Sequence, residues 1–321
     1  MPFELTPSES ASVAEMKKRL GGFETEEGRL KGLDLALVAT DVVITTSPKA
    51  GTTWVQQICH QLRAGVEGDM SFKEISEVVP FIELAHDQGQ DLEAPQFGQG
   101  RGLPRCFKTH AWEKHCPMGG KYIVVVREPK DVALSFFKFF EGWFFEPGEV
   151  PMDAFVQEFW LARGAPDSRM SNASFFDHFL SWYNRRDDPD VLFLFFEDLK
   201  SDLRGSVSRI AAFMSTDKHD FTEAALINAV VERSSFEFMH KHKDQFDEKL
   251  SKIARNEACG LAPDAGLKYS KIRAGEAGGG KRSLSPELQR MIDERWTTQM
   301  LPATGSPSYE TLRDKVAGER A

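Results

Sequence analysis

The sequence predicts a single α/β domain, residues 1–321, with a central parallel β-sheet flanked by helices. Four short runs rich in β-branched and aromatic residues are predicted as buried strands: Val42–Thr46, Arg105–Lys108, Tyr122–Val126 and Val191–Phe195. Segments with helical periodicity alternate with them, an order typical of parallel sheets covered on both faces. No convincing linker divides the 321 residues, so we expect one domain. We expect about five strands in its sheet.

The helices are predicted from apolar residues that recur every three to four positions. They cover Thr52–Arg63, Pro129–Phe140, Met152–Arg163, Ser174–Arg185, Leu203–Met214 and Phe221–Glu232. Pro129 suits the first turn of its helix, where a missing N–H costs no hydrogen bond. Two stretches, 88–104 and 240–280, lack good periodicity, and the second ends in a Gly-rich run. Long loops in compact domains are often functional, so we expect residues 240–281 to form a mobile lid.

Composition argues against several classes of protein. The net charge of −9 is unlike the basic footprint of nucleic-acid-binding proteins. The four cysteines, whose spacing fits neither a disulfide framework nor a zinc site, are Cys59, Cys106, Cys116 and Cys259. The first 20 residues lack the apolar core of a signal peptide, and the strongly apolar run Val191–Phe196 is too short to span a bilayer. We therefore expect a cytoplasmic protein with no membrane anchor.

The segment Thr45–Trp54 predicts an anion site. It follows a predicted strand and leads into a predicted helix, so backbone N–H groups and the positive end of the helix point at one spot. Lys49 adds a charge there, and the hydroxyls of Thr52 and Thr53 add donors. The loop is not a Walker A motif, in which the Lys follows the second Gly. An ordinary strand-to-helix turn with a solvated Lys49 is the alternative.

Two further candidates follow other predicted strands. Arg127 directly follows the predicted strand 122–126, and its planar donor fork suits a phosphate. Ser135 lies eight residues later in the next helix, where it can reach the anion that Arg127 binds. His110 ends Lys108-Thr109-His110 and has a pKa range suited to a general base. Ligands of open α/β sheets bind at the carboxyl ends of the strands. Two anion sites there would fit a nucleotide with phosphates at both its 5′ and 3′ positions, although Arg127 could instead form a surface salt bridge.

Together these motifs resemble those of the cytosolic sulfotransferases. The loop is similar to Pro-Lys-Ser/Ala-Gly-Thr-Thr-Trp, the segment from Arg127 to Arg-x-Pro-Lys-Asp-Val-x-x-Ser, and the strand end at His110 to Lys-Thr-His. Other matches to the family are Val79–Glu83, Ser181–Tyr183, Phe196–Lys200, Ser234–Met239 and Arg273–Gly278. The resemblance runs from about residue 40 to about residue 300.

The resemblance implies a fold similar to the P-loop nucleoside kinases and sulfonate transfer from 3′-phosphoadenosine-5′-phosphosulfate (PAPS). The acceptor would be a hydroxyl or amine of a small molecule, the second product would be 3′-phosphoadenosine 5′-phosphate (PAP), and no metal is needed. His110 would be the base, with Lys49 and Lys108 as the other catalytic residues. The implied donor-binding residues are Lys49, Ala50, Gly51, Thr52, Thr53, Trp54, Arg127, Ser135, Phe196, Ser234, Phe236, Arg273, Ala274 and Gly275.

The acceptor pocket is predicted from aromatic residues. Phe81 matches a pocket residue of the family, and an apolar wall is also expected from Phe137 and Phe140. With Lys108 and His110 these complete the predicted acceptor-binding set, although any one Phe could equally be a core residue.

The sequence also departs from the family pattern. Phe196 replaces a Tyr, Ala274 replaces a Lys, and Gly279-Gly280 replace Asp-Trp, which we expect to loosen the lid. The residues that align with the family's dimer segment differ from it at 285, 286 and 290. We therefore expect a monomer, or a dimer formed elsewhere. Two alternatives stay open: a nucleotide kinase on a similar sheet, and a nucleotide-binding relative without catalytic activity.

Overall fold

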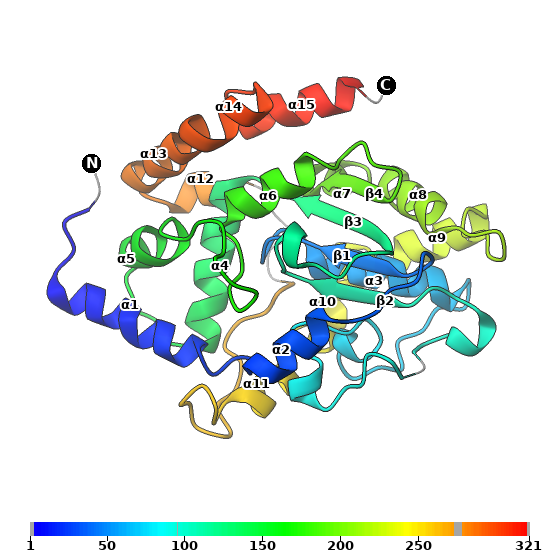
Figure 1. Cartoon of the computed structure of the whole chain (residues 1–321), viewed down its shortest axis with the longest axis horizontal. Coiled ribbons are helices and arrows are strands. Elements are labelled where there is room, and N and C mark those ends of the chain that lie inside the picture. The colour runs from blue at the N-terminus through cyan, green and yellow to red at the C-terminus, as the bar shows by residue number, and fades with distance from the viewer. Residues whose placement is uncertain (1–2, 95, 273–277, 320–321) are drawn as a thin grey trace.

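The structure, a computed structural model of the chain, describes residues 3–94, 96–272 and 278–319. Its sheet has four parallel strands in the order β2-β1-β3-β4 (Figure 1). The strands are β1 (Val42–Thr45), β2 (Cys106–Thr109), β3 (Lys121–Val126) and β4 (Val191–Phe195). All four predicted segments form strands, which confirms the fold class.

The expected number of about five strands is corrected to four within the described residues. Next to β2, the chain at Phe81 makes only one parallel bridge, to Lys108. The Lys108 N–H donates to the Pro80 carbonyl at 2.8 Å, and the Ile82 N–H donates to the Lys108 carbonyl at 2.9 Å. Pro80 has no N–H to extend the pairing, and the chain turns away after Phe81.

The strand register aligns the ends of β1 and β2, and β3 extends two residues beyond them. Thr45 of β1 lies opposite Thr109 of β2 on one side and Val124 of β3 on the other. Because all strands are parallel, the segments that follow them start at one edge of the sheet. This register brings the loop after Thr45, His110 and Arg127 to the same side of the domain.

Helices cover both faces of the sheet (Figure 1). Val42 and Ile44 pack in the layer that contains α3 (Thr52–Ala64), α8 (Leu203–Met214) and α9 (Ala224–Arg233). Val43 faces the other layer, with α4 (Pro129–Trp143) and α6 (Phe175–Tyr183). Side chains of a strand alternate between its faces, so a fully buried strand such as β1 supplies both layers.

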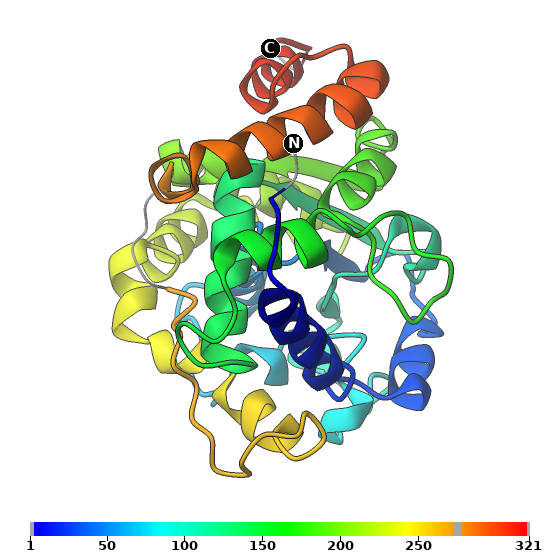
Figure 2. The same cartoon turned by 90° about the vertical axis from the view of Figure 1, so that its left-hand side faces the viewer.

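Further helices surround this core. They are α1 (Pro7–Leu20), α2 (Glu26–Leu33), α5 (Met152–Phe155), α7 (Phe196–Ser201), α10 (Phe236–Lys241), α11 (Lys249–Arg255), α12 (Gly279–Ser283), α13 (Pro286–Arg295), α14 (Leu301–Thr304) and α15 (Tyr309–Glu319). Short 3₁₀ turns cover Ile75–Glu77, His86–Gln88, Gln99–Arg101, Glu113–His115 and Lys243–Gln245, and π-helical turns cover Val156–Trp160 and Trp296–Met300. Figure 2 shows α1 at the front and α13 to α15 across the top. No helix in the described ranges is both long and apolar enough to cross a membrane.

The contact between α12 and α4 changes the interpretation of Gly279 and Gly280. The Asp131 carboxylate accepts the N–H groups of Gly278 at 2.8 Å and Gly280 at 2.7 Å. A Cβ on Gly280 would lie 2.3 Å from the Lys130 carbonyl carbon. This end of the segment is therefore hydrogen-bonded to α4, and the absence of a side chain at Gly280 permits the close approach. That the two glycines loosen the lid stays a prediction.

We predict that Gly280→Ala destabilises the protein by about 1–3 kcal/mol, because the added methyl group cannot fit without a backbone shift. Gly279→Ala is the matched control, since its Cβ would meet only the end of Leu134, at 3.6 Å. Both variants gain the same helix propensity. Denaturant unfolding measures the difference, and equal midpoints for the two variants would contradict the close contact.

Candidate active site

One cavity lies at the carboxyl ends of the strands and has a volume of about 1390 Å³. Most of the predicted site residues line it: Lys49, Gly51, Thr52, Thr53, Trp54, Phe81, Lys108, His110, Arg127, Ser135, Phe140, Phe196 and Phe236. Ala50, Ser234 and Phe137 are not part of its wall. The predicted residues Arg273, Ala274 and Gly275 lie outside the residues that the structure describes.

The loop between β1 and α3 has an unusual backbone that opens it toward the cavity. Lys49 has φ 73° and Gly51 has φ 118°, both left-handed. A side chain at Gly51 would also place its Cβ 2.9 Å from Cδ2 of Phe196, so glycine is required there. In the described chain no side chain caps the N-terminus of α3. The loop therefore presents the positive end of a helix to the cavity.

Aromatic contacts fix the end of this loop. The Trp54 indole N–H donates to the Ser234 carbonyl at 2.7 Å, so Ser234 holds Trp54 from outside the cavity. The Trp54 ring meets the Phe196 ring edge-on, with 5.6 Å between centroids. The Arg127 guanidinium lies over the same Phe196 ring, 4.3 Å from its centroid. Phe196 thus joins the loop to Arg127, although it lacks the hydroxyl of the Tyr that it replaces.

Lys49 lies between two aromatic rings. Its Nζ is 4.6 Å from the ring centroid of Phe139 and 4.8 Å from that of Tyr269. Burial lowers the pKa of Lys49 to about 7, an effect that Glu248 opposes and Lys108 strengthens. Lys49 is therefore a desolvated cation whose charge a bound anion would stabilise.

Lys108 and Lys271 share one carboxylate, that of Glu248. Glu248 is buried and has a left-handed backbone with φ 58°. Although burial opposes it, the ammonium groups of Lys108 and Lys271 hold the pKa of Glu248 well below its usual range. Burial lowers the pKa of Lys271 to about 8. With Lys49, three lysines thus converge near Glu248, and Asp247 is a second acid that acts on Lys49. Among the described residues this cluster has more basic than acidic groups.

Glu248 and Lys271 both line the cavity, although neither was predicted from the sequence. Lys271 stands two residues before Arg273, and that proximity to a predicted phosphate-binding motif could have identified it. Glu248 has no such signal, because its contact with Lys108 joins residues 140 positions apart. Both residues belong to the segment 240–281 that we expected to be a lid.

His110 is held in one tautomer. Its Nδ1 is 2.8 Å from the Thr46 carbonyl oxygen, which can only accept, so Nδ1 carries the proton and Nε2 is free to accept one. The backbone N–H of His110 donates to the Glu83 carboxylate at 2.7 Å. Burial, followed by the charge of Lys108, lowers the pKa of His110 to about 3. The imidazole is therefore neutral at physiological pH, which is the state that a general base requires.

Arg127 and Ser135 lie near the corner between β3 and α4. The Arg127 Nη2 is 3.5 Å from Asp131 Oδ2, and its buried Nε has no partner among the described residues. Asp131 also binds the amides of α12, and the described residues leave much of the Arg127 donor fork unused. The Ser135 hydroxyl is 3.4 Å from that of Tyr269. Both side chains line the cavity and can reach an anion there.

Aromatic residues line another part of the cavity. They are Phe81, Phe136, Phe139, Phe140, Phe144 and Phe159. Phe140 lies 5.1 Å from Phe159 and 4.9 Å from Phe144 between ring centroids. Phe137, expected to bind the acceptor, packs instead against Phe145 and Phe155. It is one residue from Phe136 and so is rotated by about 100° around α4, away from the cavity.

Comparisons with known proteins agree with this geometry. A model of the sulfotransferase domain family matches residues 39–303. Human sulfotransferase 1E1 is 28% identical over 82% of this chain and 85% of its own length. An amine sulfotransferase of Oryctolagus cuniculus is 30% identical over 64% of this chain and 65% of its own length.

Solved structures show the same fold. Mouse sulfotransferase SULT7A1 complexed with PAP is 23% identical, with a TM-score of 0.58 over 93% of this chain and 95% of that chain. Retinol dehydratase in complex with androsterone and PAP is 21% identical, with a TM-score of 0.61 over 94% and 97% of the two chains. The domain match covers the whole sheet and every described residue of the cavity except Lys17, Leu20, Gly21, Phe23 and Glu24. This match shows that the chain belongs to the sulfotransferase family.

Proposed function

We propose that this sulfotransferase moves the sulfonate of PAPS to a hydroxyl or amine of a small-molecule acceptor and releases PAP. The observation that carries the proposal is the position of a neutral His110 in the same cavity as Lys49, Lys108 and Arg127. The basic side chains would bind an anionic donor, and His110 would accept the proton that the acceptor loses. In the proposed mechanism the lysines supply the positive charge, so no metal ion is needed.

The donor would span the two anion sites. Its 5′-phosphosulfate would bind at the N-terminus of α3, to Lys49 and the hydroxyls of Thr52 and Thr53. Its 3′-phosphate would bind Arg127 and Ser135. The charge-assisted contact of a guanidinium with phosphate is stronger than a neutral hydrogen bond.

The adenine would lie between Trp54 and Phe236. Both rings line the cavity, and Phe236 is 38% exposed, which leaves an apolar face available for stacking. We propose that residues 240–281 close over the bound donor, since Glu248, Tyr269 and Lys271 of this segment already form part of the wall. Arg273 and Gly275 would complete the 3′-phosphate site.

Transfer would proceed as an in-line displacement. The acceptor oxygen or nitrogen forms a bond to sulfur while the bond from sulfur to the bridging 5′-phosphate oxygen breaks. The electron pair of that bond stays on the phosphate, where Lys49 stabilises the charge, and the acceptor proton goes to Nε2 of His110. Lys108 would hold the sulfonate during transfer. Catalysis is then mainly positioning and electrostatic stabilisation.

We propose a cytoplasmic enzyme that is a monomer, or a dimer that does not use the family's usual segment. In the aligned region Ser285 caps α13 through the Leu288 N–H, at 3.3 Å. This local role fits a position that differs from the family pattern.

We predict that the protein binds PAP at least tenfold more tightly than ADP or AMP, because only PAP fills both anion sites. Arg127→Ala should weaken PAP binding by about 2–3 kcal/mol through loss of a charged hydrogen-bonding group, with little effect on AMP binding. Isothermal titration calorimetry measures both. Equal affinities for PAP and AMP would contradict the 3′-phosphate site.

We predict that PAP binding takes up protons at pH 8. Burial lowers the pKa values of free Lys49 and Lys271 to about 7 and about 8, and the bound phosphates should raise both. The lysines are charged below these pKa values, so PAP affinity should fall as the pH rises from 7 to 9. Calorimetry in buffers of different ionisation enthalpy gives the proton count at pH 8, where phosphate monoesters, with pKa about 6, are fully ionised.

Lys49→Met is the variant that tests the source of these protons. It should lower the proton uptake at pH 8 because Lys49 is the more strongly perturbed of the two lysines. An unchanged uptake in this variant would show that Lys49 does not meet the donor.

We predict that His110→Ala lowers turnover by about 10²- to 10⁴-fold, as expected for loss of a general base, with PAP affinity unchanged. His178→Ala is a matched control. His178 is also buried and neutral, since burial lowers its pKa to about 3, but it binds the Thr45 hydroxyl outside the cavity. Single-turnover kinetics with a weakly acidic acceptor would show whether only the first variant loses activity.

A further inference from the structure

We propose that the acceptor carries an anionic group, such as a carboxylate, away from the hydroxyl or amine that receives the sulfonate, and that Arg163 binds it. This inference rests on the proposed function, because it concerns the acceptor of that reaction. It names a class of acceptor: amphipathic molecules with an apolar body and a negatively charged end.

Arg163 lines the cavity and has no acidic partner among the residues that the structure describes. Its guanidinium lies over the Phe159 ring, 5.1 Å from the centroid, and both residues line the cavity. Its Nη2 makes one long hydrogen bond, 3.4 Å, to the Asn172 carbonyl oxygen. Among the described residues, no carboxylate lies within ion-pair distance of it. Most of its planar donor fork, which suits a carboxylate well, is therefore unused.

Glu24 is the acidic residue whose charge acts on Arg163, and it already forms an ion pair with another arginine. Glu24, which also lines the cavity, forms an ion pair with the fully buried Arg29 at 2.6 Å. Burial raises the pKa of Glu24 to about 7, with Arg29 opposing. Burial also lowers the pKa of Arg163 to about 10, followed in effect by the charge of Arg29. Arg163 is thus still charged at neutral pH, but poorly solvated, and an anionic ligand would stabilise it.

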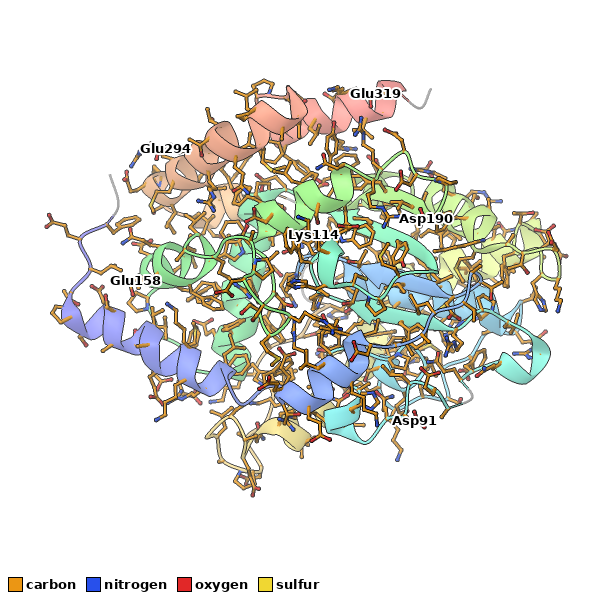
Figure 3. All side chains as sticks on the ribbon, viewed as in Figure 1. Asp91, Lys114, Glu158, Asp190, Glu294 and Glu319 are labelled. Atoms are coloured by element: carbon orange, nitrogen blue, oxygen red, sulfur yellow. The ribbon has the colours of Figure 1, made fainter. Side chains whose placement is uncertain are left out.

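The other charged residues near Arg163 in the cavity do not supply it with a partner. Lys17 of α1 lines the cavity and donates to the Glu158 carbonyl at 2.8 Å. Figure 3 shows Glu158 on the side of the molecule where α1 lies against the turn after α5. Asp167 also lines the cavity but is exposed. Of the residues that line this end of the cavity, Lys17 and Arg163 are basic and Glu24 and Asp167 are acidic. Because Glu24 is paired with Arg29 and Asp167 is exposed, neither carboxyl group neutralises Arg163.

The apolar residues near Arg163 indicate what the rest of the acceptor is. Phe159 contacts Phe140, at 5.1 Å between centroids, and Phe81 contacts His110, at 5.2 Å. The base and the guanidinium are therefore each bordered by aromatic walls of the same cavity. A molecule with an apolar body could place its nucleophile at His110 and its carboxylate at Arg163, each with a matching partner.

The test compares acceptors that differ only in this charge. Phenols and aliphatic alcohols are assayed with PAPS, each as a carboxylic acid and as the corresponding primary amide. For the best skeleton, kcat/KM for the acid should exceed that for the amide at least tenfold. Arg163→Gln should reduce this ratio to near one, mainly by raising KM for the acid, while the amide is unaffected. Arg163→Lys should retain part of the preference.

Arg169→Gln is the control, because it removes the same charge from the same loop. Arg169 pairs with Asp34 at 2.8 Å and does not line the cavity, so the preference should persist. PAP affinity equal to that of the wild type verifies that each variant is folded. Equal rates for acid and amide, or an unchanged ratio in Arg163→Gln, would overturn the inference while leaving sulfonate transfer intact. Absence of PAP binding and of all transfer would instead overturn the proposed function itself.

Discussion

The site depends on an excess of positive charge that the fold holds partly buried at the carboxyl ends of its strands. Among the described residues, Lys49, Lys108 and Lys271 converge there around the Glu248 carboxylate, with Asp247 as a further acid near Lys49. Burying a charge without a full complement of partners costs several kcal/mol, and the lowered pKa of Lys49 reflects that cost. A polyanionic donor would offset it, so the same arrangement that weakens the empty site would strengthen donor binding.

Strand register and contacts along the cavity wall position the two predicted anion sites. The parallel register of β1 with β2 and β3 brings three strand ends to one edge. Phe196 then contacts both the indole of Trp54 and the guanidinium of Arg127. Asp131 binds the amides of α12 and so competes little for Arg127. Together these contacts set the spacing between the two predicted anion sites.

The features that could be predicted from the sequence are those with a local sequence pattern. The four strands, the loop around Lys49 and the positions of His110 and Arg127 follow from motifs within a few residues. Contacts between distant segments left no such pattern, which is why Glu248 and Arg163 were missed as site residues. Phe137 was placed in the pocket because composition does not resolve which face of α4 a residue occupies. The expected total of about five strands exceeded the four segments predicted as strands, and in the described residues the pairing beyond β2 is a single bridge.

The central claim is that this charged cavity transfers a sulfonate rather than only binding a nucleotide. The most direct measurement is incubation with PAPS labelled in its sulfonate, together with a broad panel of phenols, alcohols and amines. We expect label in one or more acceptors, a product heavier by one sulfonate, and an equal amount of PAP. Tight PAP binding without any transfer across the panel would contradict the account and indicate a nucleotide-binding relative without catalytic activity.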